Sequence, residues 1–206
     1  MKKIFALLAL GFTLLSAQTF AQSARSFYNT PYRTRNIGSF SKNTGILSFG
    51  FGFPNNSGAD YDYWNDDHRI GFGPVYAKYE HGIITELGLG GYLAMAGSKY
   101  EYGPGRSYTD KIFSFGGGFL AYYHFNKLIP VKNLDVYAGA GVGFRNVAYS
   151  YDDSHGNDYS DRSDFDIFPV IKVGARYYFT RVFGVYGEGG YDKMSDVNIG
   201  VSFRFR

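Results

Sequence analysis

Serine, histidine and aspartate stand side by side in one stretch, Asp152-Asp153-Ser154-His155-Gly156. These are the residue types of a nucleophilic catalytic set, in which a histidine activates a serine and an acid orients the histidine. Such a set needs fixed hydrogen-bond geometry, whereas this stretch has the composition of a flexible polar loop. We therefore assign no catalytic residue and expect that the protein is not an enzyme.

Two groups of carboxylates raise a second possibility, a site for Ca²⁺, which takes six to eight oxygen ligands. The spacing is not that of an EF-hand, because no glycine and distal glutamate fall in register. We interpret both groups as solvated, charge-rich loops, keep Ca²⁺ binding as an alternative, and predict no metal site and no cofactor. The groups are Asp60, Asp62, Asp66 and Asp67, and Asp152, Asp153, Asp158, Asp161 and Asp164.

Glycine strings at 88–91, 116–118 and 139–143 invite comparison with dinucleotide-binding loops. None of them completes the GxGxxG pattern or opens a helix, as that motif requires. They lie inside alternating segments instead, so we attribute them to strand curvature and to interior space.

The first residues form a separate element. Lys2 and Lys3 give a positive start, an apolar run follows from Ile4 to Leu15, and Thr19-Phe20-Ala21 ends it with small residues. This is the layout of a secretory signal peptide, and the run is shorter than the roughly 20 residues of a membrane-spanning helix. We predict a cleavable signal peptide at 1–21, an irregular periplasmic N-terminal segment at 22–43, and one domain at 44–206.

Composition narrows the class of the mature chain. Without the two signal lysines it has 19 basic and 18 acidic residues, so the basic character of the whole chain gives no reason to expect nucleic-acid binding. The absence of cysteine excludes disulfides and thiol chemistry from this exported protein. The many tyrosines, phenylalanines and glycines suit curved β-strands.

Hydrophobic alternation with a period of two runs through the domain. It is clearest in the C-terminal run 197–205, where apolar residues fill every odd position and polar or small ones every even position. Seven further segments fit, at about 44–53, 69–80, 84–96, 111–125, 134–149, 165–179 and 183–192. Most are long enough for the 9–11 residues of a tilted transmembrane strand.

The connections between these segments alternate in length. Long polar stretches at 54–68, 97–110 and 151–164 alternate with shorter turns at 81–83, 126–133 and 180–182. Long loops on one rim and short turns facing the periplasm are typical of outer-membrane barrels. We therefore predict an all-β fold: an eight-stranded antiparallel up-and-down transmembrane β-barrel.

One face of the predicted strands carries the charges. A symmetric turn at Arg181 sets Gly174 opposite Glu188, and a turn centred on Gly82 sets Lys78 opposite Glu86, so opposite charges meet across strands. Glycines share this face, as a narrow lumen requires. The predicted lumen charge network is Lys78, Glu86, Arg145, Lys172, Arg176, Glu188 and Arg204.

The opposite face is apolar, and its aromatic residues gather at the strand ends. Two such girdles are expected where a barrel crosses a bilayer. One set falls near the periplasmic rim and consists of Tyr79, Tyr123, Phe125, Phe179, Phe183, Phe203 and Phe205; the other consists of Phe53, Phe113, Phe165 and Tyr191. The second strand fits less well, because Ile70, Phe72 and Tyr76 share the face of Lys78.

From about Thr44 to Arg206 the sequence resembles the small outer-membrane barrels of the OmpX and OmpA-domain type, and more closely the outer-membrane β-barrel proteins of Bacteroidetes. The resemblance is one of architecture and of a C-terminal assembly signal, matched by Asn198, Gly200, Phe203 and Phe205, although Arg206 extends the chain past the final aromatic. It implies recognition by the barrel-assembly machinery. Some related barrels modify lipid A with a Ser/His/acid set near the outer rim, but His81 and His124 fall at the periplasmic rim.

The leading hypothesis is an integral barrel of the Gram-negative outer membrane, in contact with lipid and lipopolysaccharide. Its role would be structural or one of surface interaction: adhesion, envelope integrity, or an accessory part of a surface or secretion complex. Partners would bind through loops 54–68, 97–110 and 151–164. Two alternatives stay open: a secreted, soluble lipocalin-like barrel with its apolar face inward, and a small pore, although an eight-stranded lumen is narrow enough for side chains to fill.

Overall fold

Eight antiparallel strands make up the part of the chain that the computed structural model describes, residues 39–58, 69–102, 108–153 and 162–205. The predicted signal peptide and residues 22–38 lie outside this part. The strands are β1 (Gly45–Phe53), β2 (Arg69–Gly82), β3 (Leu87–Tyr102), β4 (Tyr108–His124), β5 (Leu134–Asp153), β6 (Arg162–Tyr178), β7 (Phe183–Tyr191) and β8 (Val197–Phe205).

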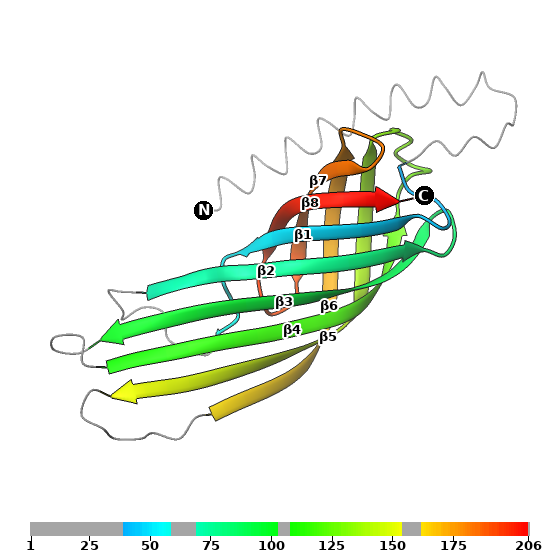
Figure 1. Ribbon diagram of the computed structural model, residues 1–206. Coiled ribbons are helices and arrows are strands. Elements are labelled where there is room, and N and C mark those ends of the chain that lie inside the picture. The colour runs from blue at the N-terminus through cyan, green and yellow to red at the C-terminus, as the bar shows by residue number, and fades with distance from the viewer. Residues whose placement is uncertain (1–38, 59–68, 103–107, 154–161, 206) are drawn as a thin grey trace, which may run out of the picture.

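The strands form a closed barrel in sequence order (Figure 1), because β8 pairs back onto β1. This seam is in register along nine residue pairs, from Gly45 with Phe205 to Phe53 with Val197. On its inner side Ser48 and Ser202 share a hydrogen bond of 2.7 Å. The predicted fold class is confirmed.

Alternation sets which side chains enter the barrel. On β1, Phe49, Phe51 and Phe53 are exposed on the outside, whereas Ile46 and Ser48 are buried inside. On β5 the small Gly139 faces the ring of Tyr122, and a Cβ atom there would lie 2.7 Å from that ring. Glycines thus make room for large interior side chains. In the described residues, no helix is long and apolar enough to cross a membrane.

The second strand keeps its apolar side outward because it contains a β-bulge. Phe72 pairs with Gly97 and Val75 pairs with Met95, so β2 has one more residue than β3 between these pairs. The extra residue reverses the alternation, and Phe72 and Val75 are both exposed outside while Tyr76 points inward. The expectation that Phe72 shares the face of Lys78 was therefore wrong.

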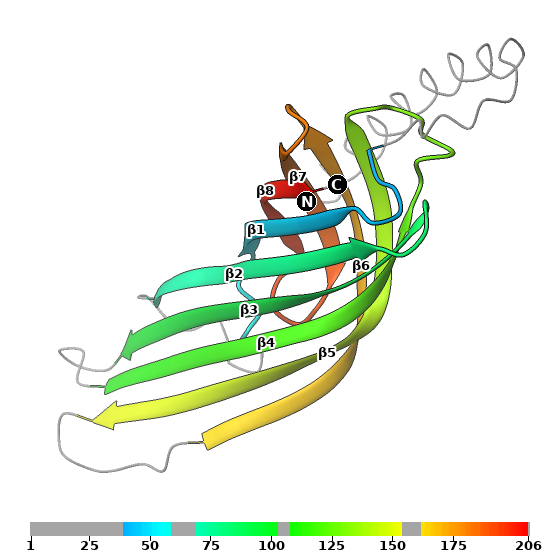
Figure 2. The ribbon, with the colours of Figure 1, turned by 45° about the vertical axis from the view of Figure 1, so that its right-hand side comes forward.

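Strand lengths are strongly unequal. β3 to β6 have 16 to 20 residues, whereas β1, β7 and β8 have nine each. As a result, β2 to β6 continue as a curved sheet beyond the level at which the short strands end (Figure 2). We call this extension the projecting sheet; it consists of residues 69–74, 97–102, 108–114, 147–153 and 162–166.

The projecting sheet corrects two of the predicted loops. Residues 97–102 and 108–110 belong to β3 and β4, and residues 151–153 and 162–164 belong to β5 and β6. Pairing continues from Gly97 with Phe113 as far as Tyr102 with Tyr108. These residues are largely polar and do not alternate regularly with apolar ones, so the sequence pattern alone does not extend the strands over them.

Candidate functional site: a charged interior closed at both ends

Two sets of buried charges lie inside the barrel, one above the other. We call the set nearer the long loops the upper set: Lys78, Lys172, Glu188 and Asp192. We call the set nearer the short turns the lower set: Glu80, His124, Asp135 and Arg176. All eight residues are buried.

The upper set is a chain of ion pairs. Lys78 Nζ lies 2.6 Å from Glu188 Oε1, and Lys172 Nζ lies 3.9 Å from the same oxygen and 2.8 Å from Asp192 Oδ2. The hydroxyl of Tyr76 donates to Asp192 at 2.8 Å, and that of Tyr137 donates to Glu188 at 3.0 Å. Each carboxylate therefore has cationic and neutral partners, as burial of a charge requires.

The lower set is built around Arg176 and His124. The Arg176 guanidinium bonds Glu80 at 2.7 Å and Asp135 at 3.0 Å. The two His124 ring nitrogens contact the same carboxylates, Nε2 at 2.5 Å from Glu80 and Nδ1 at 2.7 Å from Asp135. Carboxylates only accept hydrogen bonds, so a protonated ring satisfies both contacts. With that ring each set contains two positive and two negative groups.

The N-terminal segment closes the barrel at the end of the short turns. The ring of Phe40 stacks on His124 with 3.5 Å between centroids, and Phe40 is 1% exposed. Arg204 Nη1 donates to the Ser39 carbonyl at 2.6 Å, and Asn126 Nδ2 donates to the Phe40 carbonyl at 3.2 Å. We call residues 39–44 the inner plug.

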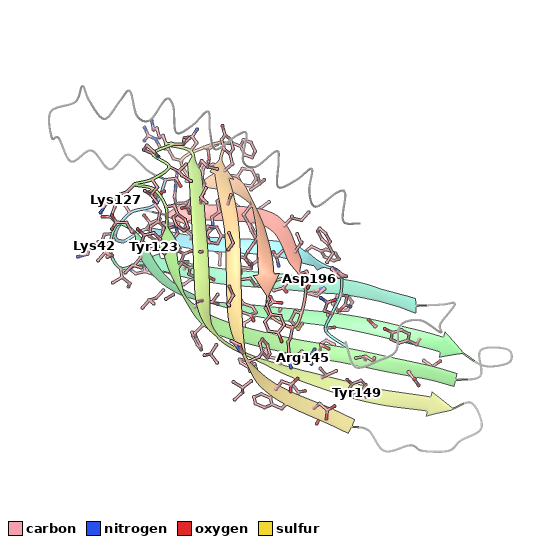
Figure 3. All side chains as sticks on the ribbon, turned by 180° about the vertical axis from the view of Figure 1, so that it is seen from behind. Lys42, Tyr123, Lys127, Arg145, Tyr149 and Asp196 are labelled. Carbon is pink, nitrogen blue, oxygen red and sulfur yellow. The ribbon has the colours of Figure 1, made fainter. Side chains whose placement is uncertain are left out.

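Two short segments close the other end. Arg145 Nη1 donates to the carbonyls of Ser57 and Lys193 at 3.1 and 3.2 Å, and its Nη2 donates to Asp166 at 2.9 Å. Met194, from the connection between β7 and β8, is completely buried in the mouth. We call residues 55–57 and 192–196 the outer cap (Figure 3 labels Arg145 and Asp196).

Six of the seven predicted lumen residues lie in the barrel interior. Lys78, Lys172, Arg176 and Glu188 belong to the two sets, Arg145 holds the outer cap, and Arg204 reaches the inner plug. Glu86 does not belong with them. The turn after β2 spans 83–86, since Gly82 pairs with Gly88, so Lys78 lies opposite Tyr92 and Glu86 pairs with Lys127 in the next turn.

Sequence reasoning missed the other half of the network: Glu80, His124, Asp135 and Asp192. The first three share the inward parity of their strands, so extending the alternation to the strand ends identifies them. Asp192 and Phe40 lie outside the strands, and no periodicity points to them. The Ser154 and His155 pair and the acidic residues 60–67 lie outside the described residues.

The assembly-signal residues divide between the two faces of β8. Asn198 is buried and accepts a hydrogen bond from the Tyr186 hydroxyl, and Gly200 faces the same way. Phe205 is exposed on the outer face, and Phe203 packs there against Phe183. Of the two predicted cross-strand pairs, Lys78 with Glu86 was wrong, whereas Gly174 with Glu188 is confirmed.

The outer surface of the barrel is apolar where the interior is charged. Phe119, Ile171 and Val142 are 80%, 58% and 58% exposed, and the predicted girdle residues Tyr79, Phe179, Phe113 and Phe165 are also exposed. A soluble lipocalin-like barrel has the opposite arrangement, so that alternative was wrong. Such a surface requires a hydrocarbon environment.

No protein-family model matches the sequence, and no curated protein matches it. Among solved structures, the fold is similar to the outer membrane protein OprG from Pseudomonas aeruginosa, with 11% identity, coverage of 82% of this chain and 99% of that one, and a TM-score of 0.51. It is also similar to the attachment invasion locus protein Ail of Yersinia pestis, crystallised with the heparin analogue sucrose octasulfate, with 16% identity, coverage of 80% and 99%, and a TM-score of 0.50.

Fold and surface together define the class: the chain is an integral β-barrel of the cell outer membrane. Within that class it is similar to the small eight-stranded barrels, as the OmpX-type resemblance implied. The closer likeness to the Bacteroidetes proteins stays a prediction.

Proposed function

We propose that the protein mediates contacts at the cell surface and that the projecting sheet is its recognition surface. The unequal strand length carries this proposal, because nothing in the membrane-spanning barrel requires strands of 16 to 20 residues. A transmembrane strand needs only 9–11 residues. The similar fold of Ail, named for attachment and invasion, is consistent with such a role.

Two open edges give the projecting sheet a means of binding. Among the described residues, β1 pairs with β2 only from Val75 to His81, and β7 pairs with β6 only from Ile171 to Tyr178. In the described part, the backbone at 69–74 and at 162–166 therefore has no strand on the side that faces away from the sheet, and the Phe72 carbonyl there accepts a hydrogen bond from Asn55 Nδ2. Exposed edges of this kind accept an added strand from a partner.

The convex face of the projecting sheet adds side-chain chemistry. A shallow groove of about 290 Å³ runs over β4, β5 and β6 and includes Lys111, Phe113, Ser150 and Ser163 in its lining. The lysine and the two serine hydroxyls suit a polar partner surface, whereas Phe113 belongs to the aromatic girdle.

Packed side chains support the concave face of the projecting sheet. Tyr100, Ile112, Val147 and Tyr149 form a buried cluster there, separate from the core of the barrel (Tyr149 is labelled in Figure 3). A rigid recognition surface loses little conformational entropy on binding. We propose adhesion through this sheet ahead of envelope integrity or an accessory role, because the sheet is built to be presented outward.

The filled interior does not favour the pore hypothesis. Both ends of the barrel are closed, and between them large side chains such as Tyr76, Tyr92, Tyr137 and Phe168 form one buried core. The lumen network is accordingly proposed to stabilise the barrel and not to conduct ions.

Biogenesis forms a further part of the proposal. We assign Asn198, Gly200, Phe203 and Phe205 to the signal read by the barrel-assembly machinery, as the resemblance implies. Phe203 and Phe205 lie on the outer face of β8, where a protein in the membrane can contact them.

Trimming the projecting sheet tests the surface role. Pairing of Lys99 with Lys111 and of Tyr149 with Arg162 allows each hairpin to be shortened in register, replacing 99–111 and 149–162 by Asn-Gly turns. Cells displaying the parent, the trimmed variant or no barrel are incubated with an array of matrix proteins, serum proteins and sulfated glycans.

The parent is expected to bind array components that the trimmed variant does not bind. The trimmed barrel must still change mobility between unheated and boiled samples on SDS gels, which shows that it is folded. Equal binding by a folded trimmed variant, or no binding by the parent above empty cells, would overturn the proposal.

A further inference from the structure

The rim that carries the short turns is cationic. Lys42, Lys127, Lys132 and Arg181 are exposed around it. Outside the buried lower set, Glu86 is the one carboxylate among the described residues of this rim, and it already pairs with Lys127. That hydrogen bond raises the pKa of Lys127, so the side chain stays charged, and its ammonium has further protons to donate.

A groove crosses the outer surface of β2 to β5 below this rim. It has a volume of about 590 Å³ and is almost wholly apolar. Gly91, Ala121 and Ala140 belong to its lining, together with the long exposed side chains of Leu89 and Phe119. It lies on the face of the barrel that contacts hydrocarbon.

The strand register places the groove below Lys127, and a hydrogen bond brings the segment that carries Lys42 to the same turn. Leu89 pairs with Ala121 in the groove, and Leu87 pairs with Tyr123 where β3 and β4 end. Glu86 and Lys127 come next along the same line, and Asn126 bonds the Phe40 carbonyl of the segment that carries Lys42. Lys42, Tyr123 and Lys127 accordingly lie at the same end of the barrel in Figure 3.

The spacing suits a lipid. Glu86 lies three positions before Leu89, in the turn directly before β3, which corresponds to about 10 Å at roughly 3.3 Å per residue. Tyr123 lies between the apolar groove and the charged turn, at the depth where tyrosine is enriched in membrane proteins. An apolar groove, an interfacial tyrosine and a cationic head therefore follow one another along one line.

We propose that this surface is a binding site for an anionic glycerophospholipid of the periplasmic leaflet. Its phosphate lies between Lys42 and Lys127, and one acyl chain occupies the groove. Charge selects the occupant, because a zwitterionic lipid with the same chains gains less from the two lysines. Each lysine near an anionic headgroup contributes enough for about a fivefold preference, so loss of both lowers the preference by at least tenfold.

Native mass spectrometry of the full mature barrel in detergent tests the site, with phosphatidylglycerol and phosphatidylethanolamine of identical acyl chains as probes. The variant Lys42→Gln/Lys127→Gln removes the head of the site. Arg181→Gln removes one charge from the same rim in the turn between β6 and β7, neither of which lines the groove, and is the matched control for Lys127→Gln. Ala121→Phe fills the groove and leaves every charge in place.

The parent is expected to retain phosphatidylglycerol at least tenfold better than phosphatidylethanolamine. Lys42→Gln/Lys127→Gln abolishes this preference, Lys127→Gln lowers it, Arg181→Gln keeps it, and Ala121→Phe weakens retention of both lipids. Heat-dependent mobility on SDS gels confirms that each variant is folded.

Several results would overturn the proposal. Equal retention of the two lipids by the parent would show that charge does not select the bound lipid. Equal loss in Lys127→Gln and Arg181→Gln would mean that only the overall charge of the rim determines retention. Unchanged lipid retention in Ala121→Phe would show that the acyl chain does not occupy the groove. A parent that forms dimers without retained lipid would show that a second copy of the chain occupies the groove.

Discussion

Glu188 is the position at which the charged interior is most sensitive to a single change. Its Oε1 lies between the ammonium groups of Lys78 and Lys172, at 2.6 and 3.9 Å. The substitution Glu188→Gln keeps the shape of the side chain and its ability to accept a hydrogen bond but removes the negative charge. The upper set then holds two cations against Asp192 alone.

The expected loss of stability follows from these distances. At an effective dielectric constant of about 20, the two attractions are about 6 and about 4 kcal/mol. A stranded lysine can instead release its proton, and releasing a proton from an ordinary lysine at pH 7 costs about 4.6 kcal/mol. This route limits the loss, so we expect Glu188→Gln to lower the free energy of unfolding by about 3 to 5 kcal/mol.

Urea unfolding in detergent micelles measures this loss. If the variant folds with one lysine neutral, its unfolded state binds more protons than its folded state, and its stability rises with pH. The deficit should therefore shrink by up to about 1.4 kcal/mol per pH unit between pH 7 and 9. The double variant Glu188→Gln/Lys78→Met removes one charge of each sign and should recover most of the loss.

Two outcomes would refute this reasoning. A loss of less than about 1 kcal/mol in Glu188→Gln is too small for a buried, uncompensated charge. A double variant no more stable than the single one indicates that packing, and not charge balance, determines the effect.

Three further predictions use the same unfolding measurement. Gly141→Ala places a Cβ atom 1.9 Å from a backbone oxygen and should destabilise the barrel by about 3 kcal/mol or more, whereas Gly187→Ala meets nothing within 4 Å and should change stability by less than about 0.5 kcal/mol. Ile171→Arg on the lipid face should lower stability by about 2 to 4 kcal/mol, whereas Ser163→Arg, about 26 Å further along β6, should be nearly neutral; equal effects would contradict the assigned membrane boundary. Phe40→Ala should lower stability by about 3 to 5 kcal/mol, and no loss would mean that the inner plug does not hold the barrel closed.

The membrane-spanning part of the fold was predictable because each strand has one side in hydrocarbon and the other in a packed lumen. The C-terminal strand illustrates this, since the predicted run 197–205 coincides with β8. The ends of β3 to β6 were not predictable in the same way. Ser98 and Lys99 lie beyond Gly97, which pairs with the girdle residue Phe113; no regular apolar alternation marks them, and their pairing depends on strands elsewhere in the chain.

The sequence predicted which charged residues face the barrel interior, but it did not predict their ion-pair partners. Inward parity identified Lys78, Lys172 and Glu188, but the partner of Lys78 is 110 residues away and reaches it across the lumen. Comparing neighbouring strands pairs Lys78 with Glu86 instead, which fails because the turn spans 83–86 and is not centred on Gly82, so that Lys78 lies opposite Tyr92. Contacts between side chains on opposite walls of a barrel depend on the barrel diameter and on the stagger of its strands. The local sequence pattern contains no information on either quantity.

The bulge on β2 is a related case. A strict period of two puts Phe72 inside, and the extra residue at Gly73-Pro74 reverses its direction. Glycine and proline within an alternating run are the signal for such a reversal, but its position is decided only by pairing with β3.

The outer cap has a consequence for how the protein can vary. Residues 55–57 and 192–196 close the mouth of the barrel through contacts with side chains of the barrel strands. Closure of the lumen therefore does not depend on the hairpins beyond them. The tips of the molecule can thus diverge in sequence, or be exchanged for foreign epitopes, without creating a leak. With the projecting sheet as the proposed recognition surface, the barrier and that surface are separate parts of one chain.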